Sequence, residues 1–484
     1  MYDVAVIGAG VIGGMLAREL TRYQLSVCLL EKESDVAMGA SKANSGIVHG
    51  GYDPVPGTLK ARMNIEGVPL IIEAARELHV PYRENGSLVV AFDEKEDAEL
   101  EGLYERGKIN GVKELRLLSG DEARQLEPAL SGAVTKALLV PRAGIVCPYA
   151  LTIAAVGNAM DNGAELLTDF GVNAVSRSEE GFTVTASDGR QVRARYLVNC
   201  AGGYADRVAE LAGDGFFRII PRAGEYLVLD KTEGDTVSRT IFQAPTANGK
   251  GILVTPTADG NLLIGPTAVP VAAPDSTETT AEGLAAVQAL ARKSVPSVNT
   301  AAVITSFSGV RASEKSGDFI IEASRRVEGL VHVAAIDSPG LTSCVAIARR
   351  AVGILMELGL PLTENKAFDG RRPAMHAFRN LSDREKDAFI REHPAYGRIV
   401  CRCEQISEGE ILEALHRNPV PTDLDGIKRR TRAGMGHCQG GFCSPYVMKL
   451  IARESGRRPE TVTKKGGGSK LIDARTGGED DDRA

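Results

Sequence analysis

The first 32 residues, MYDVAVIGAGVIGGMLARELTRYQLSVCLLEK (1–32), decide the fold. An apolar run (3–7) leads into a glycine-rich turn, a stretch with helical spacing follows, and a second apolar run ends at Glu31. Strand, turn, helix and strand in this order form a βαβ unit, the building block of parallel sheets. The sequence therefore predicts an α/β chain whose first domain is Rossmann-like.

The turn in this unit matches the pattern G-x-G-x-x-G through Gly8, Gly10 and Gly13. The first glycine allows a tight turn, the second lets the backbone approach a pyrophosphate, and the third lets helix and strand pack closely. Glu31 ends the second strand, where a carboxylate can accept hydrogen bonds from ribose hydroxyls. These four residues are predicted to bind a dinucleotide.

Length and composition limit the remaining possibilities. With 484 residues the chain is too long for one core, so two or three domains are expected. A net charge of −6 argues against nucleic acid as the main partner. No signal peptide and no apolar run of about 18 residues is visible, so we expect a cytoplasmic protein without a transmembrane segment. Its eight cysteines are then expected to be free, metal-bound or catalytic.

Two later segments favour FAD over NAD as the dinucleotide. LVNCAGGYAD (197–206) is a strand that runs into a glycine turn at Ala201 and Gly202. HVAAIDSPGLTSCVAIA (332–348) is a strand, a turn and a helix that starts near Gly340, Leu341 and Thr342. The positive end of that helix could stabilise the negative charge of a reduced flavin. A plain strand-to-helix turn is the alternative interpretation.

Several separate segments carry a family resemblance: GASKANSGIVHGGYDPVPGTLKARMNIEG (39–67), PRAGEYLVLD (221–230), TPTADGNLLIGPTA (255–268), GVRAS (309–313) and IDSPGLTSCVAIA (336–348). They resemble the D-amino-acid-oxidase-like FAD superfamily. The resemblance implies a FAD-binding domain joined to an antiparallel-sheet substrate domain. It implies that His49 lies near the reactive edge of the flavin and that Arg311 faces an anionic substrate. The further cofactor-binding residues are expected to be Ser41, Asn44, Ser45, Gly46, Val172, Ala201, Gly202, Gly340, Leu341 and Thr342.

Within this superfamily the segments are similar to the FAD-dependent glycerol-3-phosphate dehydrogenases and the L-2-hydroxyglutarate oxidases. Oxidation of an alcohol needs a proton acceptor with a pKa near neutral, which suits His49, and a small anion needs a fixed cation, which suits Arg311. His49 could instead satisfy a local hydrogen bond, and Arg311 could form a surface ion pair. Tyr52 follows the His-Gly-Gly stretch, where the membrane-associated glycerol-3-phosphate dehydrogenases carry an arginine, so the substrate anion could be a carboxylate.

The last fifth of the chain holds four cysteines, Cys401, Cys403, Cys438 and Cys443. A one-residue gap in the first pair is tight for a structural zinc site, whereas a two-iron cluster tolerates it because both thiolates can share one iron. RCEQISEGEI (402–411) and DGIKRRTRAGMGHCQGGFC (425–443) resemble the bacterioferritin-associated-ferredoxin-like [2Fe–2S] domain. The resemblance implies a [2Fe–2S] cluster on these cysteines. His437 stands where that motif has an arginine. Lys428, Arg429, Arg430 and Arg432 could offset the charge of the cluster or form a solvated basic turn.

The expected organisation has a FAD-dependent module (1–362), a connector (363–397), a [2Fe–2S] domain (398–455) and a tail (456–484). Within the first module, FAD binding is assigned to about 1–80, 140–215 and 325–362, and substrate binding to about 81–139 and 216–324. We expect a dehydrogenase that oxidises a small anionic hydroxy compound, with glycerol 3-phosphate ahead of L-2-hydroxyglutarate, and passes electrons through the cluster to a protein partner. Peripheral membrane association is compatible with this. An amino-acid oxidase or dehydrogenase and a flavin/iron–sulfur electron-transfer subunit are the alternatives.

Overall fold

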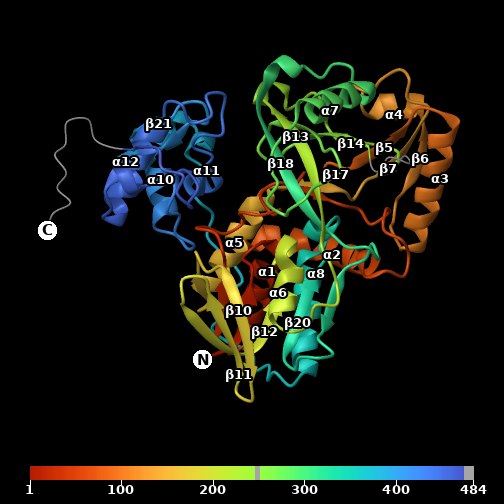
Figure 1. Ribbon diagram of the computed structural model, residues 1–484. Coiled ribbons are helices and arrows are strands. Elements are labelled where there is room, and N and C mark those ends of the chain that lie inside the picture. Colours follow the sequence, from red (N-terminus) through yellow and green to blue (C-terminus); the bar gives the residue numbers. More distant parts are fainter. Residues whose placement is uncertain (246–250, 474–484) are drawn as a thin grey trace. The chain divides into compact units, whose positions relative to one another are not determined.

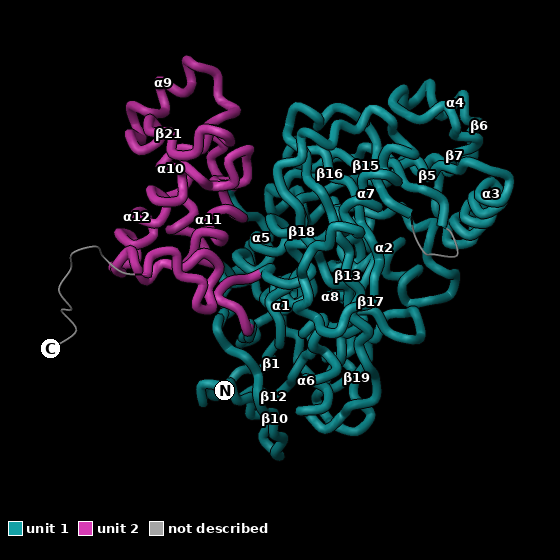
Figure 2. The backbone as a smooth tube through the Cα atoms, turned by 45° about the horizontal axis from the view of Figure 1, so that its top comes forward, with its two compact units in different colours: residues 1–31, 37–373 teal, residues 32–36, 374–484 magenta. Residues whose placement is uncertain are grey.

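The computed structural model describes residues 1–245 and 251–473. The chain divides into two compact units, shown in separate colours in Figure 2. Unit 1 contains residues 1–31 and 37–373, and unit 2 contains residues 32–36 and 374–484. None of the helices in the described part of the chain is long and apolar enough to cross a membrane.

The first sheet of unit 1 is built around the predicted βαβ unit (Figure 1). Its parallel strands lie in the order β9-β2-β1-β12-β20, because β20 pairs with β12 beside β1. A hairpin, β10 and β11, continues from β12, and β19 pairs with β20. The strands are β1 (Tyr2–Ile7), β2 (Val27–Leu30), β9 (Glu165–Leu167), β10 (Val172–Ser178), β11 (Gly181–Ala186), β12 (Gln191–Asn199), β19 (Ile320–Ala323) and β20 (Leu330–Ala334).

Helices pack on this sheet and on one another. α1 packs against both α5 and α8, α2 packs against α8, and α6 packs against β20. The helix predicted to start near Gly340, Leu341 and Thr342 is α8, which begins at Gly340. Their bounds are α1 (Val11–Leu20), α2 (Leu59–Glu77), α5 (Pro148–Asp161), α6 (Ala205–Leu211) and α8 (Gly340–Glu357).

The second sheet of unit 1 has nine strands and is antiparallel except where β5 lies beside β14. Its order is β17-β13-β16-β15-β14-β5-β7-β6, with β18 on β13. The strands are β5 (Ser87–Ala91), β6 (Arg116–Ser119), β7 (Lys136–Val140), β13 (Ile220–Leu229), β14 (Thr240–Gln243), β15 (Leu253–Pro256), β16 (Leu262–Gly265), β17 (Val269–Pro270) and β18 (Val303–Ser313). A small sheet joins β3 (Ile47–Val48), β8 (Gly144–Val146) and β4 (Tyr82–Arg83).

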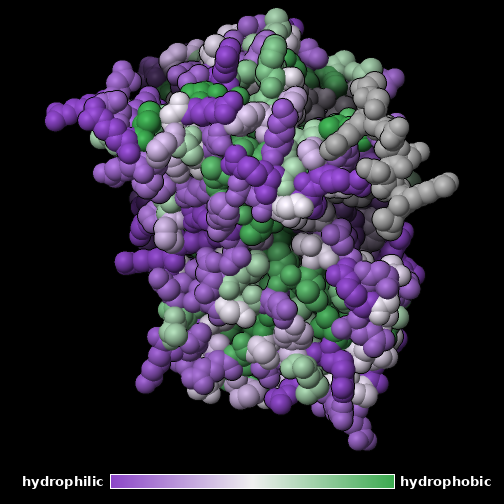
Figure 3. All heavy atoms as spheres, turned by 90° about the vertical axis from the view of Figure 1, so that its left-hand side faces the viewer, coloured by the Kyte–Doolittle hydropathy of each residue, from purple (hydrophilic) through white to green (hydrophobic). Residues whose placement is uncertain are grey.

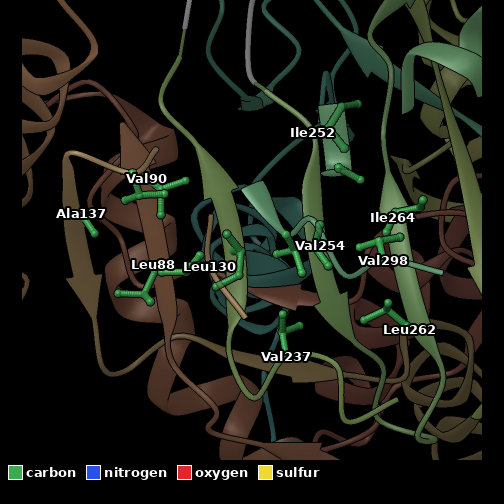
Figure 4. Packing of buried hydrophobic residues seen from close by; sticks show 14 of the residues in the cluster. Leu88, Val90, Leu130, Ala137, Val237, Ile252, Val254, Leu262, Ile264 and Val298 are labelled. Carbon is green, nitrogen blue, oxygen red and sulfur yellow. The ribbon is translucent and has the colours of Figure 1, made fainter. Parts of the chain in front are cut away.

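One face of the second sheet is buried in an apolar core. Aliphatic side chains from β5, β13, β15 and β16, among them Leu88, Leu227, Val254 and Ile264, pack together there, and Figure 4 shows part of this cluster. α7 (Ala281–Ser294) adds Val287 to the same core. The other helices of this region are α3 (Glu94–Ile109) and α4 (Gly120–Leu126). The core leaves the opposite face of β13 and β18 for other contacts.

Unit 2 has a core of its own, made by a two-stranded sheet and short helices. Its elements are α9 (Asp383–Glu392), β21 (Ile399–Cys401), β22 (Ile406–Ser407), α10 (Glu408–Leu415), α11 (Leu424–Thr431) and α12 (Ser444–Ser455). The expected connector is divided, since 363–373 belong to unit 1 while 374–397 fold into unit 2 and bury Phe378 and Tyr396. Part of the expected tail also folds, because Val462 is buried in this core. The acidic end of the tail lies outside the described residues.

Candidate functional site

The glycines of the first turn lie where a side chain would not fit. A Cβ atom on Gly13 would lie 1.9 Å from the carbonyl oxygen of Gly8. Gly8 has φ +103° and would place a Cβ 2.5 Å from the carbonyl oxygen of Cys200, next to Ala201. Gly202, with φ +56°, continues this second turn. The two predicted glycine turns are therefore in backbone contact at the ends of β1 and β12.

Two side chains converge on the first turn from more distant parts of the chain. The Glu31 carboxylate accepts a hydrogen bond from the Ala9 N–H (2.9 Å), and the Ser41 hydroxyl accepts one from the Val11 N–H (2.9 Å). The N-cap of α1 is Gly10, which has no side chain to cap the helix. A helix N-terminus reached through a glycine turn suits a pyrophosphate, and a carboxylate at the end of β2 suits a ribose. The residues thus fit a dinucleotide.

Val172 lies at the start of β10, on the segment that passes Glu31. The Phe170 N–H donates to the carbonyl oxygen of Glu31 (2.8 Å), and the Glu31 N–H donates to the carbonyl oxygen of Leu167. These bonds hold the segment that leads to Val172 beside the acidic end of β2. The structure thus brings Val172 toward the predicted dinucleotide site.

The segment 41–46 forms a compact loop between the first turn and β3. The Asn44 side chain accepts a hydrogen bond from the Gly46 N–H (2.9 Å) and donates to the carbonyl oxygen of Ala40 (2.9 Å). Gly46 has φ +67°, and a Cβ there would lie 2.5 Å from the carbonyl oxygen of Val146. Ser45 lies between these two residues and is half-buried. Asn44 and Gly46 therefore set the shape of the loop.

His49 follows β3 and is anchored from several directions. Its N–H donates to the Thr342 hydroxyl (2.8 Å), and its carbonyl oxygen accepts from the Asn64 side chain (3.0 Å). Its Nε2 lies 3.3 Å from the Ser338 hydroxyl. The ring stacks on Phe242 with 5.8 Å between centroids. The imidazole is thus oriented between the second sheet and the turn before α8.

The N-terminus of α8 lies beside His49. Thr342 is fully buried, and its hydroxyl also donates to the carbonyl oxygen of Ile47. The Gly340 N–H donates to the carbonyl oxygen of Asp337 (2.5 Å), and Leu341 follows in the first turn of the helix. Gly340, Leu341 and Thr342 therefore lie together at a helix end that favours negative charge.

Arg311 lies on β18, close to both preceding groups. Gly309, two residues earlier, approaches the loop so closely that a Cβ there would lie 1.8 Å from the carbonyl oxygen of Ala43. Two residues later, the Ser313 hydroxyl donates to the Asp337 carboxylate (2.9 Å), next to Ser338. These contacts bring Arg311, the loop 41–46 and the His49 region into one area of unit 1.

In unit 2 the four cysteines form two pairs. The Cys401 thiol is hydrogen-bonded with that of Cys443, and the Cys403 thiol with that of Cys438. The pairs therefore join the end of β21, at Cys401, and the turn after it, at Cys403, to the loop before α12, rather than joining Cys401 to Cys403. Among the residues described in 1–245 and 251–473, no three His, Cys, Asp or Glu side chains form a group that could hold one metal ion. Two pairs match a cluster with two irons better than one zinc ion.

The surroundings of Cys401 and Cys438 favour thiolates, whereas the hydrogen bond with Cys401 and burial raise the pKa of Cys443. A backbone N–H contact at Cys438 acts to lower the pKa of Cys403, but burial and the side chain of Cys438 outweigh it and raise that pKa. The Cys443 thiol and the backbone N–H groups of Gly434 and Glu404 lower the pKa of Cys401 to about 6. Burial acts to raise the pKa of Cys438, but backbone N–H groups from Phe442, Gly440 and Gly441 outweigh it and lower that pKa. Backbone N–H donors around sulfur are what a thiolate-bound cluster needs. The residues fit the expected cluster.

The arginines of α11 and Arg432, which follows the helix as its C-cap, pair with carboxylates within unit 2. Asp35 accepts hydrogen bonds from Arg429 (2.5 Å) and Arg430 (2.8 Å), and Arg432 pairs with the buried Glu404 (2.8 Å). Because Arg429 and Arg432 are buried in these pairs, the expected solvated turn is wrong, while charge compensation at the cluster stays a prediction. Burial lowers the pKa of Lys428. His437 is exposed.

Sequence reasoning missed the residues that hold His49, namely Asn64, Phe242 and Ser338. Ser338 lies inside the segment 336–348 that carried the resemblance, so its place next to a helix start was a usable signal. Asn64 lies inside the segment 39–67 that also carried the resemblance and is 15 residues from His49, so it too offered a usable signal, whereas Phe242 gave none. Arg222, directly opposite Arg311 on β13, was also missed.

Comparisons with known proteins find a matching family for each of the two units. The family model for FAD dependent oxidoreductases matches residues 3–353, and the model for the BFD-like [2Fe-2S] binding domain matches residues 399–453. A glycerol 3-phosphate dehydrogenase from Caloramator mitchellensis is 43% identical over 98% of this chain and 98% of its own length. A mitochondrial L-2-hydroxyglutarate dehydrogenase from Nematostella vectensis is 32% identical and covers 72% of this chain and 89% of its own.

The fold also matches a solved structure. L-alpha-glycerophosphate oxidase from Mycoplasma pneumoniae, with FAD bound, superimposes with a TM-score of 0.73 at 32% identity, over 77% of this chain and 98% of that chain. The matched family model covers most of unit 1, where the glycine turns, His49 and Arg311 lie. The chain therefore belongs to the FAD dependent oxidoreductase family and carries a BFD-like [2Fe–2S] domain, so that its cofactors are FAD and a [2Fe–2S] cluster.

Proposed function

We propose that this protein oxidises glycerol 3-phosphate to dihydroxyacetone phosphate and passes the electrons through its [2Fe–2S] domain to a protein acceptor. The observation that carries the proposal is the similarity to the Caloramator dehydrogenase, which extends over both units at 43% identity. The two modules also fit together chemically. A flavin accepts two electrons as a hydride, and a [2Fe–2S] cluster passes electrons on one at a time.

In this proposal His49 accepts the proton of the substrate hydroxyl. The Ser338 hydroxyl, 3.3 Å from Nε2, orients the ring for this step. Stacking on Phe242 restricts rotation of the imidazole. Because the backbone N–H and carbonyl groups of His49 are bound by Thr342 and Asn64, the residue is held in place before substrate arrives.

Arg311 binds the anionic end of the substrate in the same proposal. Its guanidinium donates to the carbonyl oxygen of Thr267 at 3.4 Å, a long contact that leaves donor groups for an anion. A planar guanidinium offers two parallel donors to a phosphate and so orients the substrate as well as binding it. The helix end at Gly340–Thr342 lies where it favours negative charge near the flavin.

Electrons leave through unit 2, where Cys401, Cys403, Cys438 and Cys443 bind the cluster. Cys403 is exposed, so the cluster has one ligand at the surface of its domain. The acceptor is a one-electron carrier protein or a component of a redox chain. A cytoplasmic location and peripheral membrane association both stay predictions.

Anaerobic reduction of the holoenzyme tests the substrate assignment. Addition of glycerol 3-phosphate without oxygen should bleach the flavin absorption, whereas glycerol, which lacks the phosphate, should bleach it far more slowly at the same concentration. Failure of glycerol 3-phosphate to bleach the flavin, with rapid bleaching by L-2-hydroxyglutarate, would reject the proposed substrate.

L-2-hydroxyglutarate is the second candidate substrate, because a relative that is named for this substrate matches much of the chain. The Nematostella L-2-hydroxyglutarate dehydrogenase is 32% identical over 72% of this chain. The membrane-associated glycerol-3-phosphate dehydrogenases, which the segment resembles, carry an arginine after the His-Gly-Gly stretch. Here the buried Tyr52 stands in that place, so the substrate anion could be a carboxylate. The same titration distinguishes the two substrates, since each is added alone to the same preparation.

A further inference from the structure

We infer that Arg222 is a second phosphate-binding residue and that it forms, with Arg311, a paired-guanidinium site for the dianionic phosphate of a small phosphate monoester. The inference rests on the proposed function and names the group that sets its substrate class. Arg222 lies on β13 and Arg311 on β18, and the two residues are direct cross-strand partners in an antiparallel pair.

The register of the two strands puts both arginines on the face that meets the flavin loop. Directly opposed residues of an antiparallel pair project to the same side of a sheet, and so do residues two apart on one strand. Gly224 and Gly309 form the next pair on that side. A Cβ on Gly309 would lie 1.8 Å from the Ala43 carbonyl oxygen, and a Cβ on Gly224 would lie 2.9 Å from Nη2 of Arg311. The arginine pair is therefore adjacent to the loop 41–46.

The other face of β13 is already occupied. Leu227 and Leu229 point into the apolar core with α7. Glu225, the acidic residue of this strand, accepts hydrogen bonds from the N–H (2.7 Å) and hydroxyl (3.0 Å) of Thr280 at the start of α7. The nearest carboxylate in sequence is therefore turned away from the two arginines.

The pair lacks counter-charge from the protein. Within residues 1–245 and 251–473, neither Arg222 nor Arg311 takes part in an ion pair with a carboxylate. Each guanidinium donates only to a backbone carbonyl at 3.4 Å, Arg222 to Ala268 and Arg311 to Thr267. Nε of Arg222 is buried and has no hydrogen-bond partner.

This arrangement is unfavourable unless an anion completes it. Like charges directly opposite on neighbouring strands repel, and a buried donor without a partner loses the hydrogen bond that it had with water. One anion that bridges the two guanidiniums removes both costs. A phosphate monoester carries close to two negative charges above a pH of about 6 and offers three acceptor oxygens, so it matches two guanidiniums better than a single carboxylate does.

Binding of inorganic phosphate to the oxidised, FAD-loaded holoenzyme tests the inference without turnover. Isothermal titration calorimetry at pH values below and above the second pKa of inorganic phosphate would compare wild type with the variants Arg222→Gln, Arg222→Lys and Arg311→Gln. Both glutamine variants should weaken phosphate binding roughly 10- to 100-fold, and Arg222→Lys should weaken it less. Wild-type affinity should rise as phosphate becomes a dianion, and Arg222→Gln should lose most of that rise.

The matched control is Arg218→Gln, which removes an exposed arginine four residues earlier that pairs with Glu210. It should leave phosphate affinity unchanged. Each variant must show the flavin spectrum and thermal unfolding of wild type, and Arg222→Lys replaces Arg222→Gln if the latter loses FAD. With glycerol 3-phosphate, Arg222→Gln should raise KM while changing the limiting rate of flavin reduction less than about 3-fold.

The outcomes separate this inference from the proposed function. Loss of phosphate binding in both glutamine variants supports the paired site even if glycerol 3-phosphate does not bleach the wild-type flavin, a result that would reject only the substrate. Wild-type phosphate affinity, pH dependence and KM in Arg222→Gln would overturn the inference while the proposed function stands. Absence of phosphate binding to wild type would also overturn it.

Discussion

At the scale of single residues, His49 is the group on which the proposed chemistry depends most. We predict that His49→Asn slows flavin reduction by glycerol 3-phosphate roughly 10²- to 10⁴-fold, because the substrate proton then has no positioned acceptor. Stopped-flow reduction under anaerobic conditions measures this rate, and phosphate affinity should stay within about 3-fold of wild type because Arg311 is untouched. His79→Asn is the control, since His79 is exposed with φ +52°, a conformation that asparagine tolerates. An unchanged rate in His49→Asn would remove this histidine from the mechanism.

Gly309 shows how one backbone contact shapes the site. We predict that Gly309→Ala loses most bound FAD, because its Cβ would lie 1.8 Å from the Ala43 carbonyl oxygen and would push β18 away from the loop 41–46. The FAD-to-protein ratio of the purified protein measures the effect. Gly353→Ala on α8 is the matched control, because a Cβ there meets nothing within 4 Å and alanine favours a helix. Full FAD content in Gly309→Ala would mean that the loop adjusts to the methyl group.

Residues that form local patterns could be predicted from sequence, and residues that act across the fold could not. Gly8, Gly10, Gly13 and Glu31 belong to one βαβ unit, so their spacing was sufficient. Arg222 and Arg311 are 89 positions apart, and only the register of β13 and β18 makes them partners. A single sequence contains no signal for that register, because β13 and β18 are far apart in the chain.

At the scale of elements, the segment 32–36 is expected to stabilise a unit other than the one that it follows in sequence. This segment follows Glu31 in the chain but belongs to unit 2, where Asp35 is 2% exposed and binds Arg429 and Arg430 of α11. From the sequence, this segment was assigned to the FAD-binding domain. Its true partners could not be seen there, because Arg429 and Arg430 lie 394 and 395 residues after Asp35. A buried carboxylate between two guanidiniums is costly to break, since each charge then lies buried without a partner.

We predict that Asp35→Asn lowers the free energy of unfolding of unit 2 by about 3 kcal/mol at pH 7. Burial acts to raise the pKa of Asp35, but Arg430 and Arg429 outweigh it and lower the pKa to about 2. Because the unfolded value is about 3.9, the contribution is complete above that pH and is lost as pH falls through about 2. Differential scanning calorimetry should therefore find the same gap between wild type and variant at pH 7 and pH 5, and a narrower gap below about pH 4.

The control for this element is Asp387→Asn, which breaks an exposed pair with Arg391 on α9. Exposed pairs contribute about 0–1 kcal/mol, so this variant should unfold close to wild type. If Asp35→Asn lowered the free energy of unfolding no more than Asp387→Asn does, other groups would neutralise Arg429 and Arg430, and the segment 32–36 would not stabilise unit 2.

At the scale of the whole molecule, two units carry two successive kinds of chemistry. Unit 1 has the glycine turns, His49 and the arginine pair, and unit 2 has the four cysteines. On the face drawn in Figure 3, hydrophilic side chains predominate. The motifs predicted both modules, because each motif is continuous in sequence. The end of unit 1 could not be predicted, because the polar composition of residues 374–397 is typical of a connector. In the structure this segment folds into unit 2, where Phe378 and Tyr396 are buried.

Because the two cofactors belong to different units, we predict that a cysteine substitution removes the cluster without affecting FAD. Cys403 is exposed, whereas Cys401 and Cys443 belong to the core of unit 2, so Cys403→Ser should remove the cluster with the least damage to the fold. FAD content and the rate of flavin reduction by glycerol 3-phosphate should stay within about 2-fold of wild type, because His49 and Arg311 lie in unit 1. Iron content and the flavin spectrum check the two cofactors independently.

The central claim is that electrons taken from glycerol 3-phosphate by the flavin leave through the [2Fe–2S] cluster. Anaerobic stopped-flow mixing of wild type and Cys403→Ser with glycerol 3-phosphate, followed by addition of a one-electron acceptor, tests it most directly. Wild type should lose flavin absorption first and cluster absorption second, and Cys403→Ser should lose flavin absorption at the same rate but reduce the acceptor at least about 10-fold more slowly. Equal acceptor reduction by the two proteins, or no loss of flavin absorption in wild type, would contradict it.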